Sequence, residues 1–333
     1  MKGKYHIEIS NSFVTYDFFI KRNYTFIRGD SGTGKTTLID LIRLSKTEPE
    51  SVNLKSDVNL KVISNEEEWN SFYKLSQIGD PDSLGNIVFF DESQAYMYKD
   101  KFLSEVKKSD NYYVIVSRSD FLSKEIVGLP YSAHEIYKLE TDESYSEKPV
   151  YNKLVEMYPS QKINTLPKII LTEDKRSGNQ FFSNIFSGKC VDADGNGNIY
   201  NKLQEFKGDN VLIVADGAAF GPYIHDIHLY TVKHPNIKLY LPESFEYMLL
   251  NSCIFDDTDI PNILKMPWNY INSAEYSSWE RYFTRKLSDL TRNTKLQYSK
   301  RKFNLNFLEY KDSILERNNL SVFLTSVTKM NLF

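Results

Sequence analysis

The sequence predicts an α/β protein with two sheet-containing domains and a helical C-terminal region. Its 333 residues exceed what one compact core usually holds. In both halves, short apolar runs typical of buried strands alternate with segments of helical period. A polar stretch with three prolines, residues 141–167, separates the halves. We expect a larger α/β domain over 1–145, a linker over 146–166, a smaller parallel-sheet domain over 167–250 and a helical region over 251–333.

Composition is that of an ordinary globular protein. Hydrophobic residues make up 41% and charged residues 26%, and the formal net charge is −3. This charge gives no global attraction to nucleic acid or to an anionic membrane, so any such surface must be local. Cys190 and Cys253 are the two cysteines, too few for a disulfide or zinc framework. With no apolar leader and no long apolar run, we expect a cytoplasmic protein without membrane contact.

The first elements form a strand–loop–helix unit. Residues 5–9 and 13–20 alternate apolar and polar side chains around a short turn, which predicts a β-hairpin. Residues 24–27 form a short apolar strand, and from Lys35 onward apolar residues recur at helical spacing. A glycine-rich loop therefore joins a strand to a helix.

The loop sequence GDSGTGKT meets the pattern G-x-x-x-x-G-K-[ST]. Glycines let backbone N–H groups turn toward phosphate oxygens, and the helix N-terminus adds partial positive charge. Lys35 is expected to reach the β and γ phosphates as a catalytic residue, and the Thr36 hydroxyl to ligate Mg²⁺. The predicted nucleotide-binding residues are Gly29, Asp30, Ser31, Gly32, Thr33, Gly34, Lys35, Thr36 and Thr37.

An acid at the end of a second buried strand completes this prediction. Residues 87–90 are four apolar residues followed by Asp91 and Glu92. Asp91 would hold the Mg²⁺ shell, and Glu92 would orient the attacking water. Another apolar strand, 112–119, ends in Ser117 and Arg118, which either sense the γ-phosphate or are ordinary loop polar groups. We expect residues 134–140 to close the sheet, with His134 in a structural role.

ATP is the expected nucleotide. The string DSLG at 82–85 precedes its strand instead of following it, and NLKSD at 53–57 is not the guanine-reading N-K-x-D. Residues 1–140 resemble the small ABC-like ATPase core of overcoming-lysogenization-defect proteins, through the hairpin, GDSGTGKTTL, IVFFDES and YVIVSRSDF. The resemblance implies a P-loop NTPase that hydrolyses ATP. No LSGGQ-like string precedes Asp91, and Ser117–Arg118 stands where the family has a switch histidine. Both a homodimer and a complex with a partner protein are compatible with the sequence.

The second half repeats strand and helix. Apolar strands are predicted within 168–174, 189–194, 210–217 and 237–244, with helices over 177–186, 198–206 and 222–234, which indicates a parallel sheet. Residues 151–158 predict one short helix inside the linker. In a parallel sheet the carboxyl ends of the strands share one edge, where ligands bind.

Five acids fall at those strand ends, and a divalent cation, Mg²⁺ or Mn²⁺, would relieve their repulsion. The predicted metal ligands of this half are Glu173, Asp192, Asp194, Asp216 and Glu243. The alternative is that acids are simply common in loops. His225 and His228 share a helix face, which more often reflects packing than metal binding.

Residues 168–245 resemble a Toprim domain, as in topoisomerases, primases and overcoming-lysogenization-defect nucleases. The resemblance implies a Mg²⁺ site acting on phosphodiesters, with Glu173 and Asp216 as catalytic residues. The family's D-x-D would begin at Asp216, but ADGAA lacks the second aspartate. The D-A-D string at Asp192 and Asp194 falls one strand early.

The C-terminal region contains an amphipathic helix over 277–296. Trp279, Phe283, Leu287 and Leu290 form its apolar face, and basic residues lie on another face and continue through 298–303. The basic stretch 281–302 is expected either to contact DNA or RNA or to be a solvated helix face.

The sequence thus favours an ATP-hydrolysing protein with a Toprim-like, Mg²⁺-dependent domain. An ATP-gated nuclease or nucleic-acid effector of phage defence or of a mobile element is the first hypothesis. The alternative is a nucleotide-dependent regulatory switch whose second domain is catalytically degenerate, which the incomplete D-x-D favours. A small-molecule kinase is a third, weaker reading.

Overall fold

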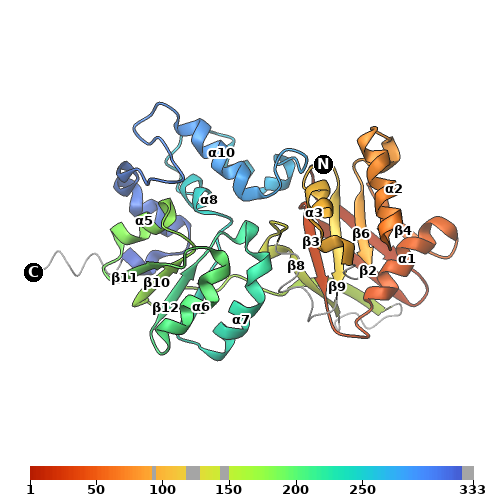
Figure 1. Cartoon of the computed structure of the whole chain (residues 1–333), viewed down its shortest axis with the longest axis horizontal. Coiled ribbons are helices and arrows are strands. Elements are labelled where there is room, and N and C mark those ends of the chain that lie inside the picture. Colours follow the sequence, from red (N-terminus) through yellow and green to blue (C-terminus); the bar gives the residue numbers. More distant parts are fainter. Residues whose placement is uncertain (92–94, 118–127, 143–149, 325–333) are drawn as a thin grey trace, which may run out of the picture. The chain divides into compact units, whose positions relative to one another are not determined.

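The computed structural model describes residues 1–91, 95–117, 128–142 and 150–324 (Figure 1). The chain forms two compact units. Unit 1 comprises Met1–Tyr158 and Trp268–Ser278, and unit 2 comprises Pro159–Pro267 and Trp279–Phe333. Each is an α/β structure, with a large mixed sheet in unit 1 and a smaller parallel sheet in unit 2. The predicted residues Glu92 and Arg118 lie outside the described ranges.

Unit 1 is built on a nine-stranded sheet of order β4-β1-β2-β9-β8-β3-β7-β6-β5. Its strands are β1 (Tyr5–Ser10), β2 (Val14–Ile20), β3 (Tyr24–Arg28), β4 (Asn53–Ser56), β5 (Leu60–Ile63), β6 (Ile87–Asp91), β7 (Tyr112–Ser117), β8 (Ile136–Thr141) and β9 (Val150–Glu156). The predicted hairpin and the predicted strands at 24–27, 87–90 and 112–119 are confirmed.

Five of these strands, β8, β3, β7, β6 and β5, run parallel to one another. The side chains of β3 and β7 are buried along their whole length, as both faces of a central parallel strand require. Among the described residues, α1 (Lys35–Thr47), α2 (Glu66–Gln77) and α3 (Asp100–Val106) lie between these strands in the chain. The carboxyl ends of β3, β7 and β6 therefore share one edge of the sheet.

Two expectations for unit 1 are wrong. Residues 151–158 are not a helix in a linker, because β9 pairs parallel with β2 and antiparallel with β8. Strand β8 consequently does not close the sheet, since β9, β2, β1 and β4 extend it on that side. Strand β9 is half-exposed and shows no clean alternation of buried and exposed side chains, so its sequence lacks the period-2 signal of a strand.

Unit 1 also includes a segment from far along the chain. The Gly3 N–H donates to the Trp268 carbonyl at 2.8 Å, and the Ser273 N–H donates to the Met1 carbonyl at 2.8 Å. The Asn23 amide donates to the carbonyls of Ser273 and Tyr276. Part of the predicted helical region 251–333, Trp268–Ser278, is therefore a strap of turns that belongs to unit 1.

Unit 2 contains a four-stranded parallel sheet of order β11-β10-β12-β13. The strands are β10 (Ile169–Thr172), β11 (Lys189–Asp192), β12 (Val211–Val214) and β13 (Ile237–Tyr240), in agreement with the four predicted strands. The chain passes from β10 to β11 on one side and then to β12 on the other, so the order reverses between β10 and β12. This reversal is the point at which open parallel sheets bind ligands.

Helices cover both faces of this sheet, as Figure 1 shows for α5 on one side and α6 and α7 on the other. The helices of unit 2 are α5 (Ser177–Ile185), α6 (Ile199–Leu203), α7 (Ile224–Lys233), α8 (Phe245–Leu250), α9 (Ile260–Lys265), α10 (Trp279–Thr291) and α11 (Lys311–Arg317). Trp279, Phe283 and Leu287 of α10 are buried, as predicted. None of the described helices is long and apolar enough to cross a membrane.

Candidate phosphate-binding loop and acidic pocket

The glycine-rich loop of unit 1 has a backbone suited to binding an anion. Gly32 and Gly34 adopt φ of 84° and 88°, in the left-handed region that favours glycine. Gly34 is the N-cap of α1, and no side chain caps the helix, so the first N–H groups remain available to a ligand. A hollow of about 190 Å³ is lined by Ser31, Gly32, Thr33, Gly34, Lys35, Thr36 and Thr37. Seven of the nine predicted nucleotide-binding residues thus surround one cavity.

The side chain of Lys35 folds back onto the loop that precedes it. Its Nζ donates to the carbonyls of Gly29 and Asp30 at 2.5 and 2.6 Å and to Thr33 Oγ1 at 3.0 Å. The two predicted residues outside the lining, Gly29 and Asp30, therefore contribute carbonyl oxygens that hold the lysine. A cation anchored at the mouth of an amide-lined hollow adds to the positive potential of the helix N-terminus.

Tyr16 fixes the loop from a neighbouring strand. This buried residue of β2 donates its hydroxyl to the Gly34 carbonyl at 2.8 Å. A Cβ placed on Gly34 would lie 2.7 Å from the Tyr16 hydroxyl, so a larger residue does not fit there. Burial raises the pKa of Tyr16, which keeps the hydroxyl protonated as a donor. The sequence analysis missed this residue, because nothing in the hairpin pattern links it to the loop.

Asp91 lies at the sheet edge that carries the loop. In the parallel register Asp91 is opposite Val116, and Ser117 is opposite Arg28, the residue that precedes the loop. One strand separates β3 from β6, so their ends are about 10 Å apart. A Mg²⁺ ion bound to a triphosphate can bridge such a gap through its water shell.

A basic residue of α1 contacts that acid. Arg43 Nη2 lies 3.2 Å from Asp91 Oδ2 and donates to Ser64 Oγ at 2.8 Å. Thr36, the other predicted Mg²⁺ ligand, is exposed in the first turn of α1. The residues present fit a nucleotide phosphate chain with its Mg²⁺, because amides, an anchored ammonium, a hydroxyl and a carboxylate share one sheet edge.

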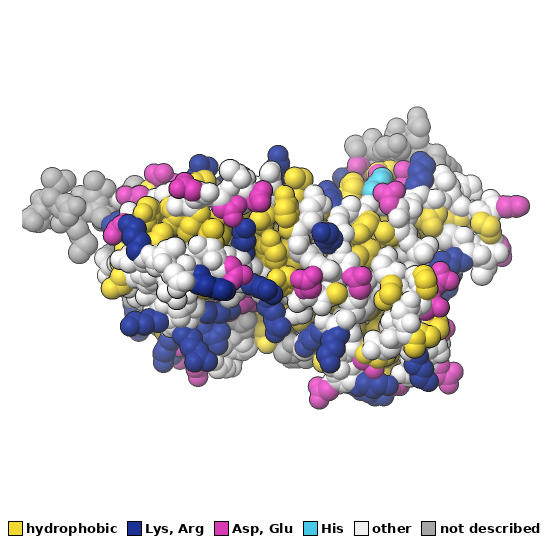
Figure 2. Space-filling model, turned by 90° about the horizontal axis from the view of Figure 1, so that it is seen from above, with side chains coloured by type: hydrophobic (Ala, Val, Ile, Leu, Met, Phe, Trp, Pro, Cys, Tyr) yellow, Lys and Arg dark blue, Asp and Glu magenta, His cyan; other side chains and the backbone are white. Residues whose placement is uncertain are grey.

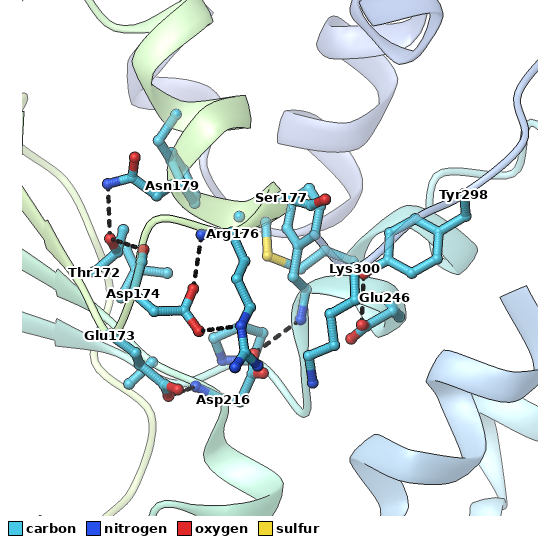
Figure 3. A pocket seen from close by; sticks show the side chains of 17 residues that line it. Thr172, Glu173, Asp174, Arg176, Ser177, Asn179, Asp216, Glu246, Tyr298 and Lys300 are labelled. Carbon is cyan, nitrogen blue, oxygen red and sulfur yellow. Dashed lines mark hydrogen bonds and ion pairs between the residues drawn. The ribbon is translucent and has the colours of Figure 1, made fainter. Parts of the chain in front are cut away.

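The candidate site of unit 2 is a small acidic pocket at the reversal between β10 and β12 (Figure 3). Its cavity of about 60 Å³ is lined by the strand ends, by the start of α5, by α8 and by residues after α10. The lining acids are Glu173, Asp174, Asp216 and Glu246, and the lining cations are Arg176 and Lys300. The structure therefore brings Glu173 and Asp216 together, as the sequence predicts.

Glu173 is held by hydrogen-bond donors. Its Oε1 accepts the backbone N–H of Asp216 at 2.5 Å. The Asn196 amide, oriented to donate, lies 2.6 Å from Glu173 Oε2 and 3.2 Å from Oε1. Burial raises the pKa of Glu173 to about 7, and the neighbouring acids Glu280 and Asp174 act in the same direction. Both of its oxygens are thus engaged by N–H groups.

Asp216 lines the same pocket as Glu173, and one of its carboxylate oxygens accepts a hydrogen bond. Its Oδ1 accepts the Phe245 N–H at 3.0 Å, at the start of α8. Burial raises the pKa of Asp216 well above its ordinary value, and Glu173, Glu280 and Glu246 add to the effect. Carboxyl groups with raised pKa values in a pocket are typical of functional sites that await a cation or a proton.

The C-terminal region supplies the rest of the pocket, which the sequence analysis did not foresee. The Tyr298 hydroxyl donates to Glu246 Oε1 at 2.6 Å, and Lys300 Nζ is ion-paired with Glu280. Although burial opposes it, Glu280 and Glu246 hold the pKa of Lys300 above its ordinary value, so the ammonium stays charged. Figure 3 shows Glu246, Tyr298 and Lys300 on one side of the cavity and Glu173 on the other.

The other predicted ligands lie elsewhere. Asp192 is 3.8 Å from Lys175 Nζ, Asp194 is exposed with φ of 59°, and Glu243 does not line the cavity. Across residues 1–91, 95–117, 128–142 and 150–324, no three His, Cys, Asp or Glu side chains form a group that could hold a metal, and this includes His225 and His228. Mg²⁺ sites that act on phosphates commonly use one or two carboxylates plus substrate oxygens, so Asp216 with one neighbour suffices.

Most basic residues of the stretch 281–302 are paired with acids of the same helix or of neighbouring segments. Arg285 and Arg292 both pair with Asp289, and Lys295 pairs with Glu309. Arg301 and Lys302, next to the pocket residue Lys300, are exposed and make no ion pair with any described residue. Figure 2 shows Lys and Arg side chains over unit 2 with acidic side chains among them.

Hydrogen bonds join the segment that carries Lys300, Arg301 and Lys302 to the start of α5, which lines the pocket. The Ser177 N–H donates to the Lys300 carbonyl at 3.2 Å, and the Gln180 amide donates to the carbonyls of Lys175 and Arg301. Residues 299–303 therefore run along the start of α5.

Searches of protein-family models and of curated proteins find no match to this chain.

Proposed function

We propose that unit 1 binds and hydrolyses ATP with Mg²⁺. The observation that carries the proposal is that the loop after β3 and Asp91 after β6 lie at one edge of a parallel sheet, with one strand between them. Amide-lined phosphate sites of this kind need an acid at that distance to hold the metal shell. The resemblance to ABC-like ATPase cores supports the same conclusion.

Each residue has a defined part in this proposal. Backbone N–H groups of residues 31–37 bind phosphate oxygens, and Lys35 neutralises charge on the β and γ phosphates. Thr36 and Asp91 would hold Mg²⁺, which supplies charge neutralisation at the transferred phosphoryl group. Glu92 is proposed as the residue that orients water.

Nucleotide binding and phosphate release test this proposal. Lys35→Ala and Asp91→Asn should each lower the rate of phosphate release by about 10²-fold or more, because charge stabilisation is the main contribution in phosphoryl transfer. Asp57→Asn, a change at an exposed position of unit 1 that makes no ion pair with a described residue, is the matched control. Wild-type protein that neither binds ATP nor releases phosphate would overturn the proposal.

For unit 2 we propose Mg²⁺- or Mn²⁺-dependent chemistry on phosphodiesters, under the control of ATP in unit 1. A reversal of strand order, paired acids with raised pKa values and adjacent unpaired cations support this assignment. The setting would be phage defence or a mobile element. The test is incubation with plasmid, single-stranded DNA and tRNA, with and without ATP and divalent ion.

A regulatory switch is the second candidate. Ala218 stands where a second aspartate would complete D-x-D, and no three acids in the described ranges are grouped to hold a metal. If the switch is correct, Glu173→Ala leaves cellular function intact while Lys35→Ala abolishes it. If unit 2 is catalytic, both variants lose function.

A further inference from the structure

The acidic pocket of unit 2 contains carboxylate oxygens that no protein donor engages. Glu246 is 1% exposed, and its Oε2 has no hydrogen-bond partner among the described residues, while its Oε1 accepts from Tyr298. Asp216 Oδ1 accepts the Phe245 N–H, and no hydrogen bond from a described residue reaches its Oδ2. A buried carboxylate oxygen without a partner costs free energy, and Glu246 Oε2 is such an atom, whereas Asp216 is half-buried and its Oδ2 lines the same cavity. A cation held between these two oxygens would offset the cost at Glu246.

Glu173 differs from both in its surroundings. Its two oxygens receive N–H groups from the Asp216 backbone and from the Asn196 amide. The bond to the Asp216 backbone fixes the turn that presents the Asp216 side chain to the cavity. Glu173 would have to give up a hydrogen-bond donor to bind a cation, whereas Asp216 Oδ2 and Glu246 Oε2 accept no hydrogen bond from a described residue.

The pocket's own cations form their ion pairs with other acids, although the Lys300 charge also acts on Glu246 and Asp216 through space. Lys300 is ion-paired with Glu280, and Arg176 Nε lies 3.1 Å from Asp174 Oδ2. The cavity of about 60 Å³ exceeds the ~10–15 Å³ that one water needs, so an ion with bound water fits.

We propose that Asp216 Oδ2 and Glu246 Oε2 are the protein ligands of a divalent cation, and that Glu173 is a positioning residue. This ligand pair replaces the strand-end set expected from the sequence. The inference rests on the proposed metal dependence of unit 2 and names the residues that provide it. A two-carboxylate site leaves the remaining positions of the ion to water and phosphate oxygens, as in many Mg²⁺ sites.

The test is binding of Mn²⁺ to the full chain without nucleotide, measured from the electron paramagnetic resonance signal of free Mn²⁺. Glu246→Gln keeps the acceptor for Tyr298 and removes the charge. Glu246→Gln and Asp216→Asn should each weaken Mn²⁺ affinity by about tenfold or more, whereas the control Glu243→Gln should stay within about threefold of wild type. An Asp91→Asn variant identifies any ion bound in unit 1.

Glu173 is tested by a conservative pair. Glu173→Ala removes the acceptor for the Asp216 N–H and should weaken Mn²⁺ affinity about tenfold, and Glu173→Gln should restore it because an amide oxygen still accepts that bond. If Glu173→Gln loses as much affinity as Asp216→Asn, Glu173 is a ligand and its positioning role is wrong. Melting curves of each variant confirm that it is folded.

The outcomes separate the two levels of the argument. If wild-type protein binds no Mn²⁺ in unit 2, the metal-dependent half of the proposed function is wrong, and this ligand assignment with it. If wild type binds Mn²⁺ and Glu246→Gln binds it equally well, only the assignment is wrong. Should Glu246→Gln not fold, Tyr298→Phe provides a second test. It leaves Glu246 charged and frees its Oε1, so the affinity should not fall.

Discussion

Gly34 provides the sharpest test of how unit 1 builds its anion-binding loop. Its φ of 88° costs an alanine about 1–2 kcal/mol, because a Cβ crowds the backbone in the left-handed region. The same Cβ would lie 2.7 Å from the hydroxyl of Tyr16, which is 1% exposed and cannot move aside freely. Overpacking of this kind adds about 1–3 kcal/mol. Gly34→Ala should therefore lower the free energy of unfolding of unit 1 by about 2–5 kcal/mol.

Gly32 is a matched control on the same loop. Its φ is 84°, but nothing lies within 4 Å of a Cβ placed on it. Gly32→Ala should cost only the conformational part, about 1–2 kcal/mol. Tyr16→Phe in the Gly34→Ala background removes the close contact and should recover about 1–3 kcal/mol, although Tyr16→Phe alone is destabilising because the Gly34 carbonyl loses its donor.

Scanning calorimetry measures the unfolding transition of unit 1, which the proposed ATP binding would raise, and a fluorescent ATP analogue measures the affinity. In a unit of this size each kcal/mol shifts the melting temperature by about 2–4 °C. Equal losses for Gly34→Ala and Gly32→Ala would refute the reasoning. So would a double variant that is no more stable than Gly34→Ala alone, since the Tyr16 contact would then contribute nothing.

Three further predictions concern other parts of the chain. Trp69→Ala should destabilise unit 1 by about 3–5 kcal/mol in urea unfolding, because the buried indole packs on Phe102 and donates to Glu105; a loss below about 1 kcal/mol would contradict this. Arg301→Ala with Lys302→Ala should weaken binding of single-stranded DNA and reduce its salt dependence, while Arg285→Ala should change neither, as measured by fluorescence anisotropy. Although burial opposes it, hydrogen bonds from Tyr151 and His6 lower the pKa of Asp17. The free energy of unfolding of unit 1 should therefore fall as the pH drops through that lowered pKa, and Asp17→Asn should make this fall smaller. If urea unfolding gives the same pH dependence for wild type and Asp17→Asn, the hydrogen bonds of the Asp17 carboxylate do not stabilise the fold.

The sequence predicts the loop and Asp91 well because their signals are local. A buried parallel strand appears as an uninterrupted apolar run, and its last residue is then known to within one position. Ile87–Asp91 and Tyr112–Ser117 follow this rule, and their register places Asp91 and Ser117 at the loop's edge. Strand β9 does not follow this rule, because this half-exposed strand has neither a continuous apolar run nor a clean alternation of apolar and polar side chains.

One missed element did carry a local signal. Asn65 caps α2 by accepting the Glu68 N–H at 2.9 Å, and the Glu68 side chain accepts the Ser64 N–H. A cap followed three residues later by glutamate marks a helix start in sequence. The helix and its buried Trp69 could therefore have been predicted.

The acidic pocket shows where sequence reasoning stops. Glu173 and Asp216 follow apolar strands, so their proximity could be predicted from sheet geometry. Glu246, Tyr298 and Lys300 reach the pocket only through the packing of α8 and the chain after α10 onto the sheet edge. No periodicity in their own segments points to that packing. Asp192 and Asp194 match a motif in letters, but they follow β11 and line no part of the cavity.

The strap formed by Trp268–Ser278 has a consequence for how this chain is made and dissected. During synthesis the ribosome delivers all nine strands of unit 1 long before the residues that bond to Met1, Gly3 and Asn23 emerge. Until most of unit 2 has left the exit tunnel, the backbone groups of Met1 and Gly3 and the side-chain amide of Asn23 are therefore open to water. A fragment that ends at Tyr158 would keep them open, so a low stability of such a fragment would reflect the missing strap and not the intrinsic stability of the nine-stranded sheet.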